Sequence, residues 1–310
     1  MEGIKLTLTN LEEFKCEFTL ENCDISLANS LRRILLAEIE TIAIHNVKVY
    51  ENTSSLPDEY IAHRLGLIPL NATKVDDYNY IWNCNCQGEC DRCTIHFDLK
   101  VYNGTNEVLE VTSLDLKQRQ DHTDEDAVRP IKVYSILPDE YGHKREVGIP
   151  IIKLSKGQQI HFECEAQKGI GKMHSKWNPV CISTFSVEPE IIFDQEIQNL
   201  DIEQKKALVN ACPTKVFGIN PHTNTLEVQD HMKCMYCEEC VYKCAEDFQK
   251  PKLIKIDHKK DKFFFKVETT GVMKPVEVLR RGFSTLRQKL DFMREQIQEN
   301  SNNQFDYSHD

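Results

Sequence analysis

The loop CNCQGECDRC, residues 84–93, holds four cysteines at the spacing C-x-C-x3-C-x2-C: Cys84, Cys86, Cys90 and Cys93. At this spacing four thiolates can converge on one tetrahedral ion, and Gly88 eases the turn between them. Zinc is the metal that such a set favours. Because four protein ligands leave no open coordination position, the sequence predicts a structural zinc site rather than a catalytic one. Four unligated cysteines are the less favoured alternative.

A second group of cysteines follows the run C-x2-C-x2-C-x3-C: Cys234, Cys237, Cys240 and Cys244. A further cysteine, Cys212, lies upstream, directly before Pro213. In ferredoxins the first three cysteines of such a run and a remote Cys-Pro bind one four-iron, four-sulfur (4Fe–4S) cluster, while the fourth serves another cluster. The predicted ligands are therefore Cys212, Cys234, Cys237 and Cys240, with Cys244 as a spare or substitute ligand. A second zinc site is the alternative that the spacing leaves open.

The elements that must position these cysteines begin with a hairpin and a helix. Residues 4–20 alternate apolar and polar side chains on both sides of a polar turn, which predicts two strands with one buried face. The period then becomes helical, with Asp24 or Ser26 as N-cap and an apolar stripe formed by Leu27, Leu31, Ile34, Leu35 and Ile39. Short alternating runs between residues 42 and 172 predict a mostly β unit that contains the first cysteine loop.

The last predicted element is a long helix that opens near Pro275. Its apolar residues repeat at alternating spacings of four and three, which predicts a coiled-coil-like seam formed by Leu279, Phe283, Leu286, Leu290, Met293 and Ile297. Packing of this seam within its own domain and packing against a partner subunit are both open. The polar tail, residues 299–310, is predicted to be disordered.

The composition is that of an ordinary globular protein, with 40% hydrophobic residues, 28% charged residues and a formal charge of −11. Such a charge offers no broad basic face, so we expect no direct sequence-specific DNA binding. No apolar run is long enough to cross a bilayer, so no membrane association is expected. The thirteen cysteines gather mostly at metal-ligand spacing, which favours a reducing compartment over a disulfide scaffold.

Motifs for nucleotide or hydride chemistry are absent from the sequence. It has no GxxxxGKS/T loop, no dense aspartate cluster for two magnesium ions and no GxGxxG fingerprint. We therefore expect a protein that is not an enzyme. An iron–sulfur electron carrier or redox-sensing protein is the alternative function, although a carrier would need a redox partner site or a second cofactor.

Four ordered stretches carry a family resemblance: ANSLRRILLAEIETIAI, DEYIAHRLGLIPL, KLSKGQQIHFECEAQKGIGKMHSKWNP and FFFKVETTGVMKPVEVL. Together they resemble the α-like subunits of cellular RNA polymerases, namely bacterial α, its archaeal counterpart and the third-largest subunit of eukaryotic RNA polymerase II. The match runs over nearly the whole chain. The first cysteine loop is similar to the polymerase II version, and the second cysteine group is similar to the archaeal α-like version and some eukaryotic relatives.

The resemblance implies an α+β fold with a split dimerisation domain, an antiparallel sheet plus two helices, in residues 1–41, 173–195 and 251–298. A β-rich insert domain with the zinc loop, residues 84–93, is expected over residues 42–172. A small ferredoxin-like module is expected over residues 196–250.

The implied function is that of a noncatalytic scaffold and assembly subunit of DNA-dependent RNA polymerase, polymerase II in particular. Implied partners are a smaller α-like subunit that forms a heterodimer with this chain, the second-largest subunit, and small zinc-binding polymerase subunits. By matching motifs, Arg32 and Arg33 would contact the second-largest subunit, and His63 and Arg64 lie in a similarly placed block, with a surface ion pair or helix cap as the alternative. A eukaryotic subunit of this kind would be nuclear, and otherwise cytoplasmic.

Overall fold

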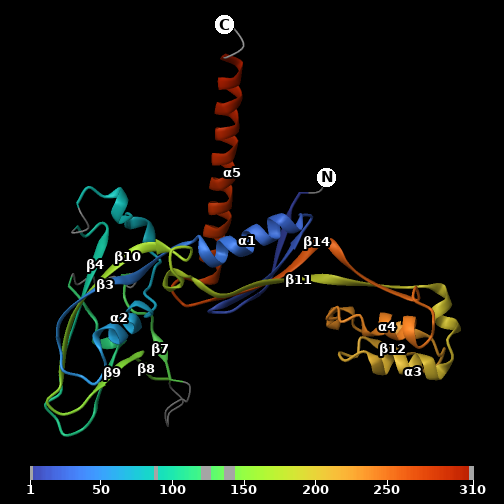
Figure 1. Cartoon of the computed structure of the whole chain (residues 1–310), viewed down its shortest axis with the longest axis horizontal. Coiled ribbons are helices and arrows are strands. Elements are labelled where there is room, and N and C mark those ends of the chain that lie inside the picture. The colour runs from blue at the N-terminus through green and yellow to red at the C-terminus, as the bar shows by residue number, and fades with distance from the viewer. Residues whose placement is uncertain (1–2, 87–89, 120–126, 136–143, 307–310) are drawn as a thin grey trace. The chain divides into compact units, whose positions relative to one another are not determined.

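The computed structural model describes the chain except for residues 1–2, 87–89, 120–126, 136–143 and 307–310. The turn expected at Gly88 therefore lies outside the described residues. The chain forms two compact units, and Figure 1 labels many of their elements. The first comprises residues 1–9, 17–29 and 184–266, and the second residues 10–16, 30–183 and 267–310. The domain boundaries expected from the sequence stay a prediction.

The first unit is built on a four-stranded sheet in the order β1–β2–β14–β11. Its strands are β1 (Lys5–Leu11), β2 (Lys15–Glu21), β11 (Val180–Phe193) and β14 (Ile254–Thr269). The hairpin predicted at the start of the chain is thus present as β1 and β2. Phe18 and Leu20 alternate into the core, where the Phe18 ring stacks on Phe265 at a centroid distance of 4.7 Å. β1 stays exposed along most of its length.

The same unit contains a small module, residues 196–250, between β11 and β14. Its elements are α3 (Ile202–Ala211), β12 (Phe217–Ile219), β13 (Leu226–Val228) and α4 (Glu239–Glu246). A capping box starts α3, because Asp201 accepts from the Gln204 N–H at 2.7 Å and Gln204 accepts from the Asp201 N–H at 3.2 Å. Buried residues from every element of the module form one core: Leu208, Cys212, Val216, Phe217, Leu226, Cys240 and Cys244.

The second unit contains a sheet in the order β3–β10–β4–β6. Its strands are β3 (Glu40–Asn52), β4 (Thr94–Tyr102), β6 (Lys117–Gln118) and β10 (Gln159–Ile170). Two short antiparallel pairs accompany it: β5 (Leu109–Thr112) with β9 (Pro150–Leu154), and β7 (Val133–Tyr134) with β8 (Glu146–Val147). β10 pairs antiparallel with β3 and β4 and buries Ile160, Phe162 and Cys164 at alternate positions. The mostly β character predicted for this region is confirmed.

A helix that the sequence analysis missed interrupts this region. α2 (Asp58–Gly66) lies in a stretch read only as part of a β unit. Pro57 occupies its N-cap position, Asp58 and Glu59 fill its acidic first turn, and Ile61 and Leu65, four residues apart, form its buried stripe. These signals are local, but the helix is too short for periodicity alone to reveal it.

The predicted first helix is α1 (Ile25–Ala37). Asp24 rather than Ser26 caps it, because the Ser26 N–H donates to Asp24 Oδ1 at 2.8 Å. Leu31, Ile34 and Leu35 are buried, as the stripe predicts.

The last element, α5 (Pro275–Asp306), packs beside α1 through Gly282. A Cβ atom at Gly282 would lie 2.6 Å from Leu35 Cδ2, so only glycine permits this approach without a shift of Leu35. Arg281 adds a bidentate ion pair with Asp76, at 2.8 and 2.7 Å. The expectation of a disordered tail from residue 299 is wrong in part, because the helix runs through Asp306. Each residue added to an established helix gains a hydrogen bond, which offsets a polar composition.

Among the described residues no helix is long and apolar enough to span a membrane. The architecture as a whole is a mixture of helices and antiparallel sheets, in agreement with the α+β class expected from the sequence.

Candidate metal centres and partner surfaces

The first cysteine group, Cys84, Cys86, Cys90 and Cys93, brings four sulfur atoms to within 4.8 Å of one another. The Sγ–Sγ distances are 3.1 Å for Cys84–Cys86, 3.4 Å for Cys84–Cys90, 3.3 Å for Cys86–Cys93 and 3.6 Å for Cys90–Cys93. Tetrahedral zinc with Zn–S bonds of about 2.3 Å places its sulfur ligands about 3.8 Å apart. The four thiols therefore fit one tetrahedral ion of this size.

Short backbone turns hold this group in place. The Cys84 N–H donates to Ile81 O at 3.1 Å, and the Cys93 N–H donates to Cys90 O at 3.0 Å. Cys93 directly precedes β4 and is buried, and this burial raises the pKa of its thiol to about 12. The thiol stays protonated unless a cation supplies the compensating charge, which is the usual coupling between metal binding and thiol ionisation.

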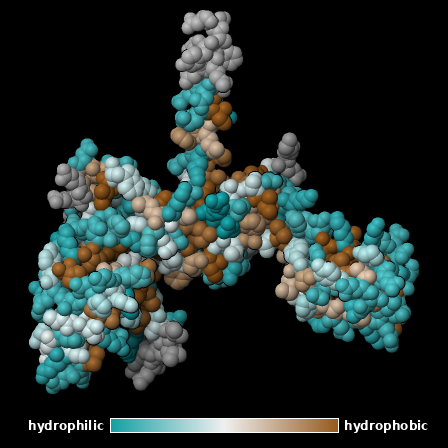
Figure 2. All heavy atoms as spheres, in the orientation of Figure 1, coloured by the Kyte–Doolittle hydropathy of each residue, from teal (hydrophilic) through white to brown (hydrophobic). Residues whose placement is uncertain are grey.

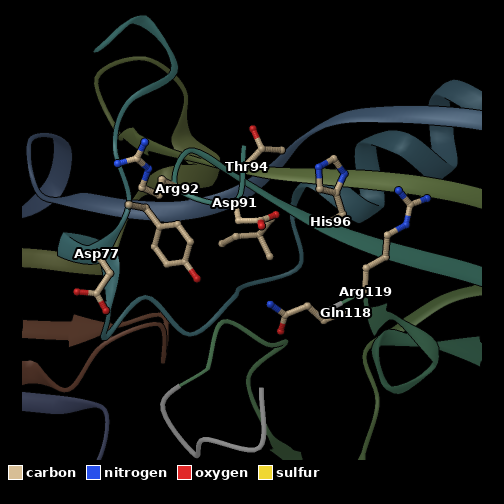
Figure 3. A pocket seen from close by; sticks show the side chains of 9 residues that line it. Asp77, Asp91, Arg92, Thr94, His96, Gln118 and Arg119 are labelled. Atoms are coloured by element: carbon tan, nitrogen blue, oxygen red, sulfur yellow. The ribbon is translucent and has the colours of Figure 1, made fainter. Parts of the chain in front are cut away.

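A pocket of about 350 Å³ lies beside this group, between the loop that carries Asp77 and the start of β4 (Figure 3). Asp91 and Arg92, which lie between two cysteines of the group, contribute to its lining, and His96 and Arg119 line it from the strand side. The pocket mixes charges of both signs and so points to no single class of ligand. We describe it as the hollow between the cysteine loop and the sheet.

The second cysteine group, Cys212, Cys234, Cys237 and Cys240, comes from three places in the module. Cys212 is the C-cap residue of α3, Cys234 follows a short 3-10 turn at His231–Lys233, and Cys240 lies in the first turn of α4. The fold of the module thus brings these cysteines, which are distant in sequence, into one region where they interact electrostatically. Cys212 and Cys240 are buried, Cys234 is half-buried and Cys237 is exposed.

The backbone around the second group adopts left-handed conformations at three residues other than glycine: Lys215 (φ 55°), Tyr236 (φ 56°) and Glu238 (φ 58°). Such residues are uncommon, and they mark a chain that wraps tightly. Burial raises the pKa of Cys212, but N–H donors of the following turn, including Val216 at 3.3 Å from Sγ, lower it more, so its pKa is lowered overall. This arrangement favours a thiolate.

The two cysteine groups differ in the distances between their sulfur atoms. Within the described part of the chain, no three sulfur atoms of the second group lie within 4.8 Å of one another. Burial is the main cause that raises the pKa of Cys240 to about 12, and the nearby Cys212, Cys234 and Cys237 raise it further. The four thiols are therefore near enough to interact, but their sulfur atoms are more widely spread than those of the first group.

Cys244 is on α4, one turn after Cys240, and is fully buried in the module core. Burial alone raises its pKa to about 11. Its surroundings are those of a packed apolar residue, and its role as a spare ligand stays a prediction.

The basic residues expected to contact the second-largest subunit lie on two helices. Arg32 and Arg33 are on α1, half-buried and exposed respectively. His63 and Arg64 are exposed on α2, but Arg64 donates to Pro150 O at 2.6 Å and so ties α2 to β9. An intrachain role is therefore sufficient to explain Arg64, whereas Arg33 offers a guanidinium on the surface.

The predicted seam of α5 changes character along the helix. Leu279 is buried, and Phe283 and Leu286 are half-buried. The following seam residues, Leu290, Met293 and Ile297, are 53%, 60% and 66% exposed. Figure 2 shows hydrophobic side chains along this part of α5. Packing within the unit therefore covers only the first half of the seam.

A buried charge network in the second unit was missed by the sequence analysis. Glu163 accepts from Tyr50 Oη at 2.7 Å and from Arg119 at 3.0 Å, and it lies 3.5 Å from His96 Nδ1. Tyr50, the largest cause, and Arg119 lower the pKa of Glu163 to about 2. The side chains of His96, Glu163 and Glu165 lie close enough together to surround a cation. However, Lys48 already neutralises Glu165, and Arg119 already neutralises Glu163. We assign no metal to this network.

Comparison with known proteins gives concordant matches. The family model described as "RNA polymerase Rpb3/Rpb11 dimerisation domain" matches residues 17–290. A "Conjugation stage-specific protein" of Tetrahymena thermophila is 96% identical over 310 residues, which is 100% of each chain. The DNA-directed RNA polymerase II subunit rpb3 of Dictyostelium discoideum is 38% identical over 298 residues, 95% of each chain. The subunit 3 of DNA-directed RNA polymerases II, IV and V of Arabidopsis thaliana is 38% identical over 296 residues, 94% of this chain and 90% of that one.

Proposed function

The chain belongs to the RNA polymerase Rpb3/Rpb11 dimerisation-domain family, and from this we infer that it is a noncatalytic scaffold subunit of a DNA-directed RNA polymerase. The relatives at 38% identity are named as subunits of polymerase II or of polymerases II, IV and V, which favours polymerase II for this chain. Catalysis would belong to the large subunits. A nuclear location follows from that assignment.

The observation that carries this proposal is the uncovered half of the α5 seam, which begins at the end of the matched region. Leu290 lies at the end of the residues that the family model matches, and it is exposed together with Met293. Apolar residues at coiled-coil spacing are stable in water only when another helix covers them. We assign this surface to the heterodimer with a smaller α-like subunit.

A second surface would hold the second-largest subunit, aided by small zinc-binding subunits. Arg32 and Arg33 on α1 are the residues we assign to it, because Arg33 is exposed at a helical position where a guanidinium can reach a partner carboxylate. His63 would be peripheral. Arg64 would act by positioning α2, through its bond to Pro150 O.

We assign zinc to the first cysteine group. Cys84, Cys86, Cys90 and Cys93 would hold the ion, which would crosslink the loop and leave no coordination position for chemistry. The Sγ–Sγ distances of 3.1 to 3.6 Å support one ion of this size.

We assign a 4Fe–4S cluster to the second cysteine group. Cys212, Cys234, Cys237 and Cys240 would hold it, with a wider separation of sulfur atoms than a single ion needs. The donors around Cys212 Sγ support a thiolate there. A second zinc ion is the competing occupant. When bound, the cluster would crosslink α3 and α4 and so stabilise the fold of the module.

Co-expression tests the scaffold and both metals together. The chain is produced anaerobically with a smaller α-like subunit, and the purified complex is analysed for co-elution, metal content and electron paramagnetic resonance. We expect one zinc and four irons per chain together with a stable pair. Two zincs without iron would overturn the cluster but leave the scaffold, whereas a monomer that ignores the partner would overturn the scaffold.

The proposed interface at the α5 seam can be tested by introducing charged residues into it. Leu290→Asp with Met293→Asp places two carboxylates in the proposed interface and should weaken the pair at least about tenfold, because truncated interface anchors cost about 2 kcal/mol or more. Gln288→Asp introduces the same side chain at a position between seam residues, on the other side of the helix, and should leave the pair intact. Equal weakening by both variants would contradict the assignment.

A further inference from the structure

A groove of about 430 Å³ lies in the module between α3 and β12. Lys206 and Val209 line it from α3, and Phe217, Gly218 and Ile219 line it from the strand. The groove lies outside the α5 seam and outside the four cysteines of the second group, so neither proposed role accounts for it.

The strand side of the groove is an unpaired edge. Among the strands that the structure describes, β12 pairs only with β13, and Gly218 faces Glu227. On either side of that pair the Asn220 N–H donates to Thr225 O at 2.9 Å and the Gln229 N–H donates to Val216 O at 2.9 Å. Because hydrogen-bonded and non-hydrogen-bonded pairs alternate in an antiparallel ladder, Phe217 and Ile219 must point their N–H and C=O groups away from β13.

These outward groups find no hydrogen-bond partner among the residues that the structure describes. The groove therefore presents the main-chain donors and acceptors of a strand edge beside a half-buried apolar residue of α3, Val209. Backbone groups in that state are a template for another extended chain.

The charge of the groove indicates which kind of peptide it would bind. Lys206 and Lys215 line the groove, no acidic residue does, and neither lysine forms an ion pair with any described residue. Three other lysines of the module form ion pairs, Lys233 with Asp230, Lys243 with Asp247 and Lys250 with Glu196. In a chain with a formal charge of −11, a groove whose two charged lining residues are both lysines favours acidic ligands.

We propose that the outer edge of β12 is a docking site for an extended, acidic peptide segment of another protein, which adds to the hairpin as a third strand. Main-chain bonds to Phe217 and Ile219 set its register. Apolar side chains of the segment cover Val209 and Ile219, and its carboxylates lie by Lys206 and Lys215.

The test uses the full-length chain and a fluorescein-labelled peptide of alternating valine and glutamate, with fluorescence anisotropy as the readout. We expect this peptide to bind and a peptide of alternating valine and lysine not to bind. Methylation of alternate peptide nitrogens should abolish binding, because it removes the strand hydrogen bonds and retains the charge. Binding that survives methylation, or that is equal for both charges, would overturn the proposal.

A matched pair of variants locates the site. Lys206→Glu, an exposed change on α3, should weaken binding about fivefold, since exposed ion pairs contribute up to about 1 kcal/mol. Lys250→Glu changes an exposed lysine of the same module outside the groove and should have no effect. Equal weakening by both variants would contradict this site. Self-association of the chain that Lys206→Glu abolishes would make a second copy the occupant, and would overturn the proposal of an acidic partner.

Discussion

The first and second cysteine groups each offer four thiols, but they differ in how closely these approach and in what surrounds them. The sulfur atoms of the first group come to 3.1–3.6 Å in a loop next to β4, and three of the four residues remain partly accessible. The second group is more widely spread, and two of its members, Cys212 and Cys240, belong to the hydrophobic core of the module.

This difference predicts how far each fold would depend on the metal that we propose for it. The loop of the first group is attached to a sheet whose core consists of residues such as Phe97, Phe162 and Leu99, which need no metal to pack. The module has a much smaller core, in which cysteines replace part of the apolar surface. Small domains with so little core need a crosslink or a metal to remain folded.

The largest expected effect is the loss of the module fold after Cys237→Ser. Cys237 is exposed, so the change removes a proposed ligand without disturbing the core. Binding free energies of structural metals reach about 10 kcal/mol, comparable with the whole stability of a domain. We expect hydrogen–deuterium exchange to lose protection across α3 and α4, while the zinc content stays at one per chain.

The matched control is Cys181→Ser, another exposed cysteine, which lies outside both groups. It should leave exchange and metal content unchanged. Protection of α3 and α4 that survives Cys237→Ser would break the comparison, because the module would then fold without its metal.

Cys90→Ser should have a smaller effect. We expect the zinc to be lost and the loop to loosen, at a cost of about 2 kcal/mol in the free energy of unfolding. The ladder between β4 and β10 should keep its exchange protection, because it rests on the apolar face of the sheet. Global unfolding of the second unit would show that the loop matters as much as the module's cluster does.

Cys244→Ala sharpens the comparison inside the module. If Cys244 only packs in the core, the change creates a small cavity, costs about 1 kcal/mol, and leaves the iron content intact. A thermal melt combined with iron analysis measures both quantities. A fall in iron content would instead identify Cys244 as a ligand.

The smallest expected effect is a loss of stability at low pH that depends on Glu188. Glu188 on β11 faces Lys259 and Lys262 of β14 and His231 of the module, and the two lysines, Lys259 first, lower its pKa to about 2. A glutamate in the unfolded chain has a pKa of about 4.3. The contribution of ionised Glu188 to the free energy of unfolding is therefore fully present above that pH and is lost as the pH falls towards 2. Glu188→Gln should therefore lower stability by about 1 kcal/mol at pH 6 and by almost nothing at pH 2. Thermal melts between these values measure the difference, and a difference independent of pH would contradict the assigned pKa.

Local spacing made the first cysteine group predictable, because four cysteines within ten residues of one loop must lie close together in the structure. The strand β2, α1 and the first half of α5 were predictable for a related reason, since their periodic stripes face cores that the structure does bury. The end of α5 was misjudged, because composition suggested disorder where an existing helix continues.

Long-range features were not predictable. Tyr50, Arg119 and Glu163 meet across more than forty positions of sequence, and nothing in their local pattern announces the buried network. The free edge of β12 is equally hidden, because it depends on which strand lacks a second neighbour. Pairing between distant strands is set by the tertiary fold, and single-sequence patterns do not contain it.

If the open half of α5 binds the smaller α-like subunit, as we propose, it ties the folded population of this chain to the supply of that partner. A partner that binds only the folded state adds about 2.7 kcal/mol of stability when its concentration is a hundred times the dissociation constant. Copies made in excess of the partner would keep Leu290, Met293 and Ile297 in water and lack that increment. Such orphan copies are the ones that aggregation and proteolysis remove first, so under this proposal the helix surface would itself regulate subunit stoichiometry.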